Sequence, residues 1–187
     1  MNGLERSFYC AADRLHRGGH VPSVLAAGVD ITALYGTRPY LGIDRIVTGD
    51  MFFDFAEDGK PAWLVPVGQP YRVAWEWIDD IVAFFPDDSS NWWLQRGSAQ
   101  ILGLYQVEMA RWLGEPLVLQ RTPSDWLCAG MKGAVILDRN IDPRSAFYDI
   151  AEIRVADDCI GQAIEQRLAD LSRPEFRIVP MEVRNGA

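Results

Sequence analysis

Basic residues are scarce in this chain of 187 residues, and lysine is the scarcest, because only Lys60 and Lys132 occur. The 18 arginines and lysines face 26 acidic residues, so the formal net charge is -8 at pH 7. A protein that binds nucleic acid or an anionic membrane needs a basic patch, and no stripe of Lys or Arg is present. The charge therefore argues against nucleic acid and membranes as partners. It leaves a protein partner or a small molecule.

Cysteine and histidine are rare as well. Cys10, Cys128 and Cys159 are odd in number and far apart, which favours reduced thiols in a cytoplasm over a disulfide-stapled secreted domain. The first residues lack the basic and apolar segments of a signal peptide, so none is expected. No apolar run approaches the length of about 18 residues that a membrane helix needs. We therefore expect a cytoplasmic protein.

Complete catalytic signatures are missing. No Gly-x-Ser-x-Gly elbow occurs, and a Ser/His or Cys/His pair would have to use one of two histidines near the start. Gly130 and Gly133 flank a lysine just before an apolar strand, whereas a P-loop follows a strand and precedes a helix. A helix cap and a tight turn explain these glycines. The sequence leans away from an enzyme, and no cofactor is expected.

What the chain does contain is apolar patterning typical of a folded domain. Hydrophobic residues make up 49% of the chain, and seven of its residues are Trp. In the first forty residues Leu4, Phe8 and Leu15 recur at helical spacing, and Pro22 and Asp30 mark the starts of two further short helices. We therefore predict a single α+β domain over 1–187, with a helical N-terminal segment over 1–40.

From Met51 the apolar residues alternate, which predicts strands. Asp58-Gly59 is a strong hairpin signal, and Asp79-Asp80 should end a strand before 81–85 resumes as another. Pro66 indicates an edge strand or a bulge at that position. One face of the meander is expected to carry the aromatic side chains of Phe53, Phe55, Trp63, Tyr71, Trp75 and Trp77. The prediction is an antiparallel β-meander with an aromatic face, packed by helices.

The second half of the chain is predicted to alternate between helices and strands. Asp and Ser residues over 87–91 resemble N-caps and predict a helix that carries Trp92 and Trp93 and runs to about Gly103. A further helix over 104–115 fits less cleanly. Short strands are predicted at 117–119, 133–137, 153–155 and 176–183, and helices after Pro123 and after Asp157 or Asp158.

Three sets of residues are candidates for chemistry. Cys10, His16 and His20 are the nearest approach to a metal cluster, although zinc wants four such ligands and no second pair follows. Asp138 at the end of a buried strand, with Asp142 after it, is the best carboxylate pair for catalysis. The same two residues also suit a turn and a helix cap.

Trp75 and Trp77, with Asp79 beside them, could stack and orient a ligand, and core packing is the competing interpretation. Trp92 and Trp93 cannot both face inward on a helix, so one of them is a candidate for partner contact. The leading hypothesis is a non-enzymatic interaction protein. The alternative is a small-ligand binder or enzyme with a Trp-lined pocket and a strand-end aspartate.

Two stretches carry a likeness to known sequences: DDIVAFFPDDSSNWWLQRGSAQILG at 79–103 and LQRTPSDWLCAGMKGAVILD at 119–138. They resemble an uncharacterised bacterial family associated with phage- or plasmid-derived gene clusters. The resemblance covers about a quarter of the chain. It implies an intracellular accessory protein of a mobile element, and it implies no activity, cofactor or catalytic residue.

Overall fold

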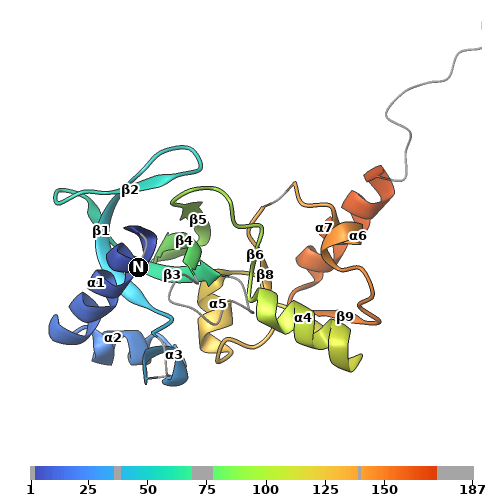
Figure 1. Ribbon diagram of the computed structural model, residues 1–187, viewed down its shortest axis with the longest axis horizontal. Coiled ribbons are helices and arrows are strands. Elements are labelled where there is room, and N and C mark those ends of the chain that lie inside the picture. The colour runs from blue at the N-terminus through green and yellow to red at the C-terminus, as the bar shows by residue number, and fades with distance from the viewer. Residues whose placement is uncertain (1–2, 36–38, 69–77, 139, 172–187) are drawn as a thin grey trace, which may run out of the picture.

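The structure is a computed structural model that describes residues 3–35, 39–68, 78–138 and 140–171. The α+β class predicted from the sequence is confirmed, with helices packed around an antiparallel sheet (Figure 1). The helices are α1 (Gly3–Arg17), α2 (Val21–Ala26), α3 (Thr32–Tyr35), α4 (Leu104–Leu113), α5 (Pro123–Cys128), α6 (Pro143–Ala146) and α7 (Asp158–Leu171). The strands are β1 (Gly42–Thr48), β2 (Phe53–Phe55), β3 (Lys60–Gly68), β4 (Ile78–Phe85), β5 (Asp88–Leu94), β6 (Ile101–Leu102), β7 (Leu117–Leu119), β8 (Val135–Ile136) and β9 (Ile153–Val155).

The main sheet has five strands in the order β2-β1-β3-β4-β5, and every neighbouring pair is antiparallel. The hairpin predicted at Asp58-Gly59 is wrong, because β1 lies between β2 and β3. The turn itself exists, since the Gly59 N–H donates to the Ala56 carbonyl at 3.0 Å. Its backbone passes so close to β1 that a Cβ on Gly59 would lie 2.4 Å from the Ile46 carbonyl oxygen. Glycine is therefore needed at position 59 because the turn passes close to the backbone of β1, and not because a hairpin joins β2 to β3.

The sequence pattern does not predict strand β1, because its charged residues Asp44 and Arg45 interrupt the apolar alternation. Both side chains are used: Asp44 pairs with Arg14 of α1, and the Arg45 guanidinium donates to the Gly59 carbonyl at 2.8 Å. Gly42 at the start of β1 lets α1 approach closely, because a Cβ there would lie 2.9 Å from Ala11 Cβ. The strand is fixed by these tertiary contacts more than by its own pattern.

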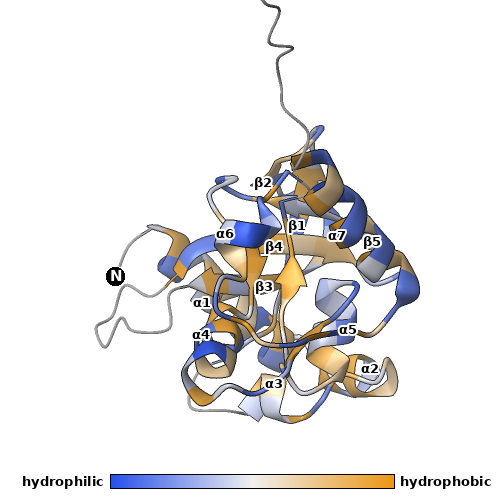
Figure 2. Cartoon of the chain, turned by 90° about the vertical axis from the view of Figure 1, so that its right-hand side faces the viewer, coloured by the Kyte–Doolittle hydropathy of each residue, from blue (hydrophilic) through white to orange (hydrophobic). Residues whose placement is uncertain are grey.

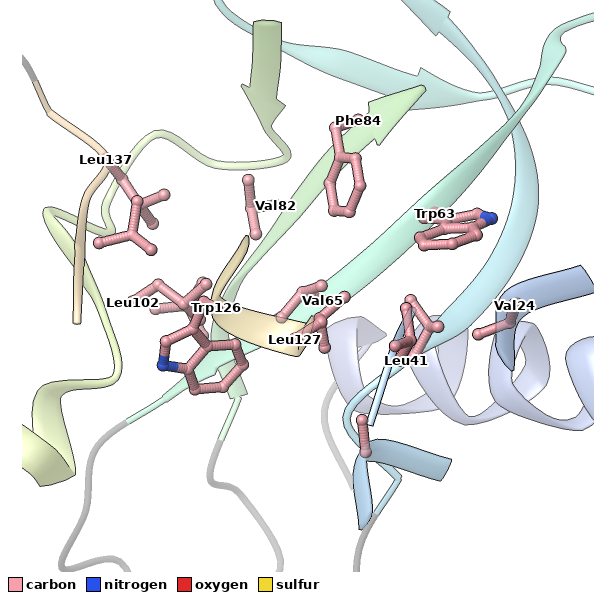
Figure 3. Close-up of a cluster of buried hydrophobic side chains, with 14 of the residues drawn as sticks. Val24, Leu41, Trp63, Val65, Val82, Phe84, Leu102, Trp126, Leu127 and Leu137 are labelled. Atoms are coloured by element: carbon pink, nitrogen blue, oxygen red, sulfur yellow. The ribbon is translucent and has the colours of Figure 1, made fainter. Parts of the chain in front are cut away.

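The sheet buries both faces. On one face α1 supplies Leu4, Phe8 and Ala11 against Leu64 and Ile81, among others. On the other, α2, α3 and α5 cover a cluster that includes Trp63, Val65, Val82, Phe84, Trp126 and Leu127 (Figure 3). Helices on both faces explain why β3 reads as a continuous apolar run.

The single aromatic face expected for the meander is wrong for the residues that the structure describes. Phe53 packs in the cluster with α1, whereas Trp63 lies in the cluster on the opposite face of the sheet. Tyr71, Trp75 and Trp77 lie outside the described residues. The aromatic side chains are thus divided between two cores.

The helix predicted over 92–103 is also wrong, because Trp92 and Trp93 belong to strand β5. Of the residues predicted as N-caps, Asp87 lies in the turn between β4 and β5, whereas 88–91 belong to β5, where Asp88 accepts hydrogen bonds from Ser90 Oγ and Asn91 Nδ2. Local hydrogen bonding by Asp and Ser occurs at the start of this strand as it does at the start of a helix. The sequence alone did not decide between them.

The prediction that Asp79 and Asp80 end a strand is wrong, because both residues lie inside β4. Asp80 is fully buried, and its carboxylate accepts hydrogen bonds from its own strand and from the connection that follows β5. Oδ1 accepts from the backbone N–H groups of Ile81, Gln95 and Arg96 at 2.8, 3.1 and 2.9 Å. Oδ2 accepts from those of Ser98 and Ala99 at 2.8 and 3.2 Å, and from Ser98 Oγ at 3.3 Å. We call this arrangement the Asp80 clamp.

Pro66 lies in β3, an interior strand of the sheet, at a position where that strand has a partner on one side only. The ladder between β1 and β3 runs only from Lys60 to Leu64, so Pro66 faces β4 alone. The register between β3 and β4 shifts just after it, between Val67 and Gly68. The irregularity expected at this proline is therefore present, one residue further along.

A third cluster organises the C-terminal part, which gathers on the side of the molecule away from α1–α3 (Figure 1). Val107 and Ala110 of α4 pack with Leu117 and Leu119 of β7, which pairs in parallel with β9. The elements predicted at 104–115, 117–119, 123–129, 153–155 and 158–171 are confirmed. The strand predicted at 176–183 lies outside the described residues. Within the described ranges, no helix is long and apolar enough to cross a membrane.

Candidate functional site

The strand-end carboxylates Asp138 and Asp142 serve the local backbone. Asp138 Oδ1 accepts the N–H of Asn140 at 2.8 Å, which closes the turn after β8. Asp142 caps α6 by accepting the N–H of Arg144 at 2.9 Å, and its side chain also meets Arg144 Nε at 3.4 Å. The contacts that the structure gives these two residues are those of a turn and a helix cap.

Cys10, His16 and His20 are spread along and beyond the first helix. Cys10 is exposed on α1, and His16 packs on the ring of Tyr35 with the ring centroids 5.5 Å apart. His20 precedes α2 and lines a groove with Asp44 and Glu57. Among the described residues, no three Cys, His, Asp or Glu side chains are placed to hold a metal ion together.

Of the aromatic and acidic residues predicted to contact a ligand or partner, some lie outside the described residues and the others are half-buried. Trp75 and Trp77 lie outside the described residues. Trp92 and Trp93 are half-buried on opposite faces of β5, and each indole N–H donates to a backbone carbonyl, of Leu137 at 3.3 Å and of Gly49 at 3.0 Å. Asp79 is half-buried in β4, where its carbonyl accepts from Ser98 Oγ at 3.3 Å. Both indoles are thereby tied to the backbone, and part of each side chain stays accessible.

The most exposed aromatic side chain among the described residues is Trp112 on α4, at 83%. Helix α4 buries Val107 and Ala110, and Trp112 projects from the opposite side. Tyr105 shares that outer side because the two residues are two helical turns apart. Together with the exposed Leu113 and Tyr148, these residues form what we call the Trp112 surface.

Arg111 connects α4 to the segment that carries Tyr148. Its Nε donates to the Tyr148 carbonyl at 3.1 Å, and its guanidinium carbon lies 3.8 Å from the centre of the Tyr148 ring. Glu108, one turn earlier, forms an ion pair with the same guanidinium. Arg111 is mostly buried, with 13% of its side chain exposed. Tyr148, at the edge of the Trp112 surface, is therefore held against α4 before any partner arrives.

A hollow of about 270 Å³ lies beside this surface, lined by Glu108, Arg111 and Tyr148 among others. Exposed acidic residues adjoin it in the sequence: Asp149 follows Tyr148, and Glu115 follows Leu113 after one glycine. An exposed Trp and Tyr around an ordered arginine combine the residue types that dominate binding at protein interfaces. The arrangement suits recognition of another protein surface.

The exposure of Trp112 can be predicted from the sequence, although it is not among the contact candidates named there. On a helix over 104–113, Trp112 falls on the side opposite Val107 and Ala110, where a large aromatic residue cannot join the core. The uncertain spacing of this helix in the sequence obscured that placement. Tyr148 has no comparable signal, because Arg111 positions it across a long sequence separation.

Comparison of the chain with models of known protein families, with curated proteins and with solved structures gave no match.

Proposed function

We propose that this protein is a non-enzymatic accessory protein, encoded by a mobile genetic element, that binds a protein partner in the cytoplasm through the Trp112 surface. The observation that supports it is the 83% exposure of Trp112 on the helix whose Arg111 holds Tyr148. An indole left in water forgoes one of the largest burial free energies of any side chain, and interface hot spots are enriched in Trp, Tyr and Arg.

The charge of the molecule selects the kind of partner. A formal net charge of -8 attracts a basic protein over a long range and repels acidic ones. Glu115 and Asp149, exposed beside the aromatic residues, extend that field to the rim of the Trp112 surface. The proposed partner therefore presents an apolar patch surrounded by Lys or Arg.

Affinity capture from native lysate tests the proposal when the wild-type protein is compared with Trp112→Ala. A partner is expected to bind the wild type and to be lost with the variant, and the purified pair is then measured by calorimetry. A central Trp contributes about 2 kcal/mol or more, so Trp112→Ala should weaken the Kd by about 30-fold. The salt dependence of the rate of association reports the charge of the partner.

Met51→Ala is the matched control, because Met51 is another exposed apolar side chain, in the connection between β1 and β2. It should capture the partner as the wild type does. Circular dichroism confirms that both variants fold. A partner that binds Trp112→Ala as tightly as the wild type would refute the assignment of this surface, and finding no specific partner at all would refute the proposed function.

A further inference from the structure

A second hollow, of about 450 Å³, lies where α7 crosses the ends of the small strands. Helix α7 carries both hydrophobic and hydrophilic residues (Figure 2), and its apolar residues Ile160, Ala163 and Ile164 line this space. We call it the Trp92 groove. Its apolar lining is Trp92, Leu119, Ile136, Ile141, Pro143, Ile160, Ala163 and Ile164, and its polar lining is Gln120, Arg121, Cys159 and Arg167. The volume lies in the range of about 300–1,000 Å³ that small-molecule sites occupy.

Arg167 supplies the unusual feature of this lining. Its Nε is shielded from solvent and has no hydrogen-bond partner among the described residues. One terminal nitrogen donates to the Asn140 carbonyl at 3.3 Å, and no carboxylate within the described ranges pairs with the guanidinium. A partly buried guanidinium charge without a counter-ion among the described residues is costly, and an anion in the groove would pair with it.

The other arginine of the groove is already engaged. Arg121 forms an ion pair with Asp157 at 3.3 Å. Asp157 also accepts the N–H of Cys159 at 2.7 Å, so its carboxylate is fixed at the start of α7. The charge that remains uncompensated in the groove therefore belongs to Arg167.

We propose that the Trp92 groove binds a small amphipathic carboxylate, with its head group on Arg167 and its hydrocarbon chain along Ile141, Ile160 and Ile164. Two requirements lead to this class of ligand. The apolar lining favours a hydrocarbon chain, and the guanidinium favours a carboxylate, which it can bind through two parallel hydrogen bonds. Trp92 at the edge of the groove should sense the chain.

Titration of the full chain with sodium octanoate, followed by calorimetry and by Trp fluorescence, tests the proposal. Octanoate should bind saturably, and octylammonium, 1-octanol and acetate at least about tenfold more weakly, because each lacks either the charge or the chain. Trp92→Phe should remove most of the fluorescence change and keep the calorimetric affinity. Trp112→Ala should bind octanoate as the wild type does, so this test is independent of the proposed function.

Arg167→Gln is the decisive variant. It should weaken octanoate binding by about tenfold, to the level of 1-octanol, and leave 1-octanol unaffected. Arg154→Gln, which changes an exposed arginine of β9 outside the groove, should bind octanoate normally. The proposal is overturned if octylammonium binds as well as octanoate, if Arg167→Gln retains wild-type affinity, or if octanoate does not bind at millimolar concentration. Circular dichroism shows that each variant is folded.

Discussion

The Asp80 carboxylate supplies the hydrogen-bond acceptors that a helix or strand would otherwise give to the backbone of the connection after β5. The residues from Gln95 to Gln100 form neither helix nor strand, so their backbone N–H groups need other acceptors. The Asp80 carboxylate meets four of these groups, at Gln95, Arg96, Ser98 and Ala99. A buried carboxylate is tolerated here because hydrogen bonds to N–H donors stabilise its charge.

Replacing Asp80 by Asn should therefore destabilise the fold. An amide has one NH₂ in place of an oxygen, and that group would face N–H donors instead of accepting from them. We expect a loss of about 3 kcal/mol in the free energy of unfolding, measured by urea denaturation. Asp54→Asn, on the exposed side of β2, should change stability by less than about 0.5 kcal/mol. Equal stabilities for the two variants would contradict the role assigned to the Asp80 clamp.

Cys159 offers a prediction about acidity at the residue scale. A hydrogen bond to Asp157 and then the negative charge of that carboxylate raise the pKa of the Cys159 thiol above its usual value. Because the thiolate is the reactive form, Asp157→Asn should lower this pKa and speed alkylation by iodoacetamide at pH 8 several-fold. The amide oxygen of Asn can still accept the Cys159 N–H, so the helix start is kept.

Site-resolved mass spectrometry measures this rate for each cysteine in the same sample. Cys10, exposed on α1, is the internal reference and should react equally in both proteins. Slower or unchanged alkylation of Cys159 in the variant would contradict the assigned cause of the shift.

At the scale of elements, the sequence predicts those helices and strands that are determined by their own residues, and it does not predict those that depend on tertiary contacts. Helices α1, α5 and α7 carry their own spacing and caps, and all three were found. Strand β1 depends on partners on both sides, and β5 begins with Asp and Ser residues that also suit a helix start. The candidate site divided in the same way, since the turn and cap roles of Asp138 and Asp142 were foreseen as an alternative and the Trp112 surface was not.

Two glycines with left-handed backbones permit a matched test at the element scale. Gly133, before β8, has φ 83°, and a Cβ there would lie 2.2 Å from the Val118 carbonyl oxygen. Gly114, after α4, has φ 66° and open space around the position of a Cβ. Gly114→Ala should cost about 1–2 kcal/mol, from backbone strain alone. Gly133→Ala should cost clearly more, because β7 and β8 must also separate.

Calorimetry of thermal unfolding measures the melting temperatures of the two variants and tests whether Gly133→Ala loses more stability than Gly114→Ala. Equal melting temperatures would show that the contact between Gly133 and Val118 is easily relieved.

At the scale of the whole molecule, the core clusters predict a single cooperative unit. The cluster around Trp63 also contains Leu15 from α1 and Leu137 beyond β8, so it joins segments from both halves of the chain. We therefore expect one calorimetric unfolding transition, with equal calorimetric and van't Hoff enthalpies. Two resolved transitions would instead divide the chain into domains and contradict the prediction of a single one.

The Asp80 clamp has a consequence for motion. The segment from Gln95 to Gln100 connects β5 to β6 and so carries the chain from the main sheet toward the Trp112 surface and toward the elements that complete the Trp92 groove. An irregular segment usually exchanges its amide hydrogens with water quickly. Here the amides of Ser98 and Ala99 are held by a buried carboxylate, so their deuterium uptake should be as slow as that of β4. The connection then behaves as a rigid joint, which fixes the direction in which both sites face.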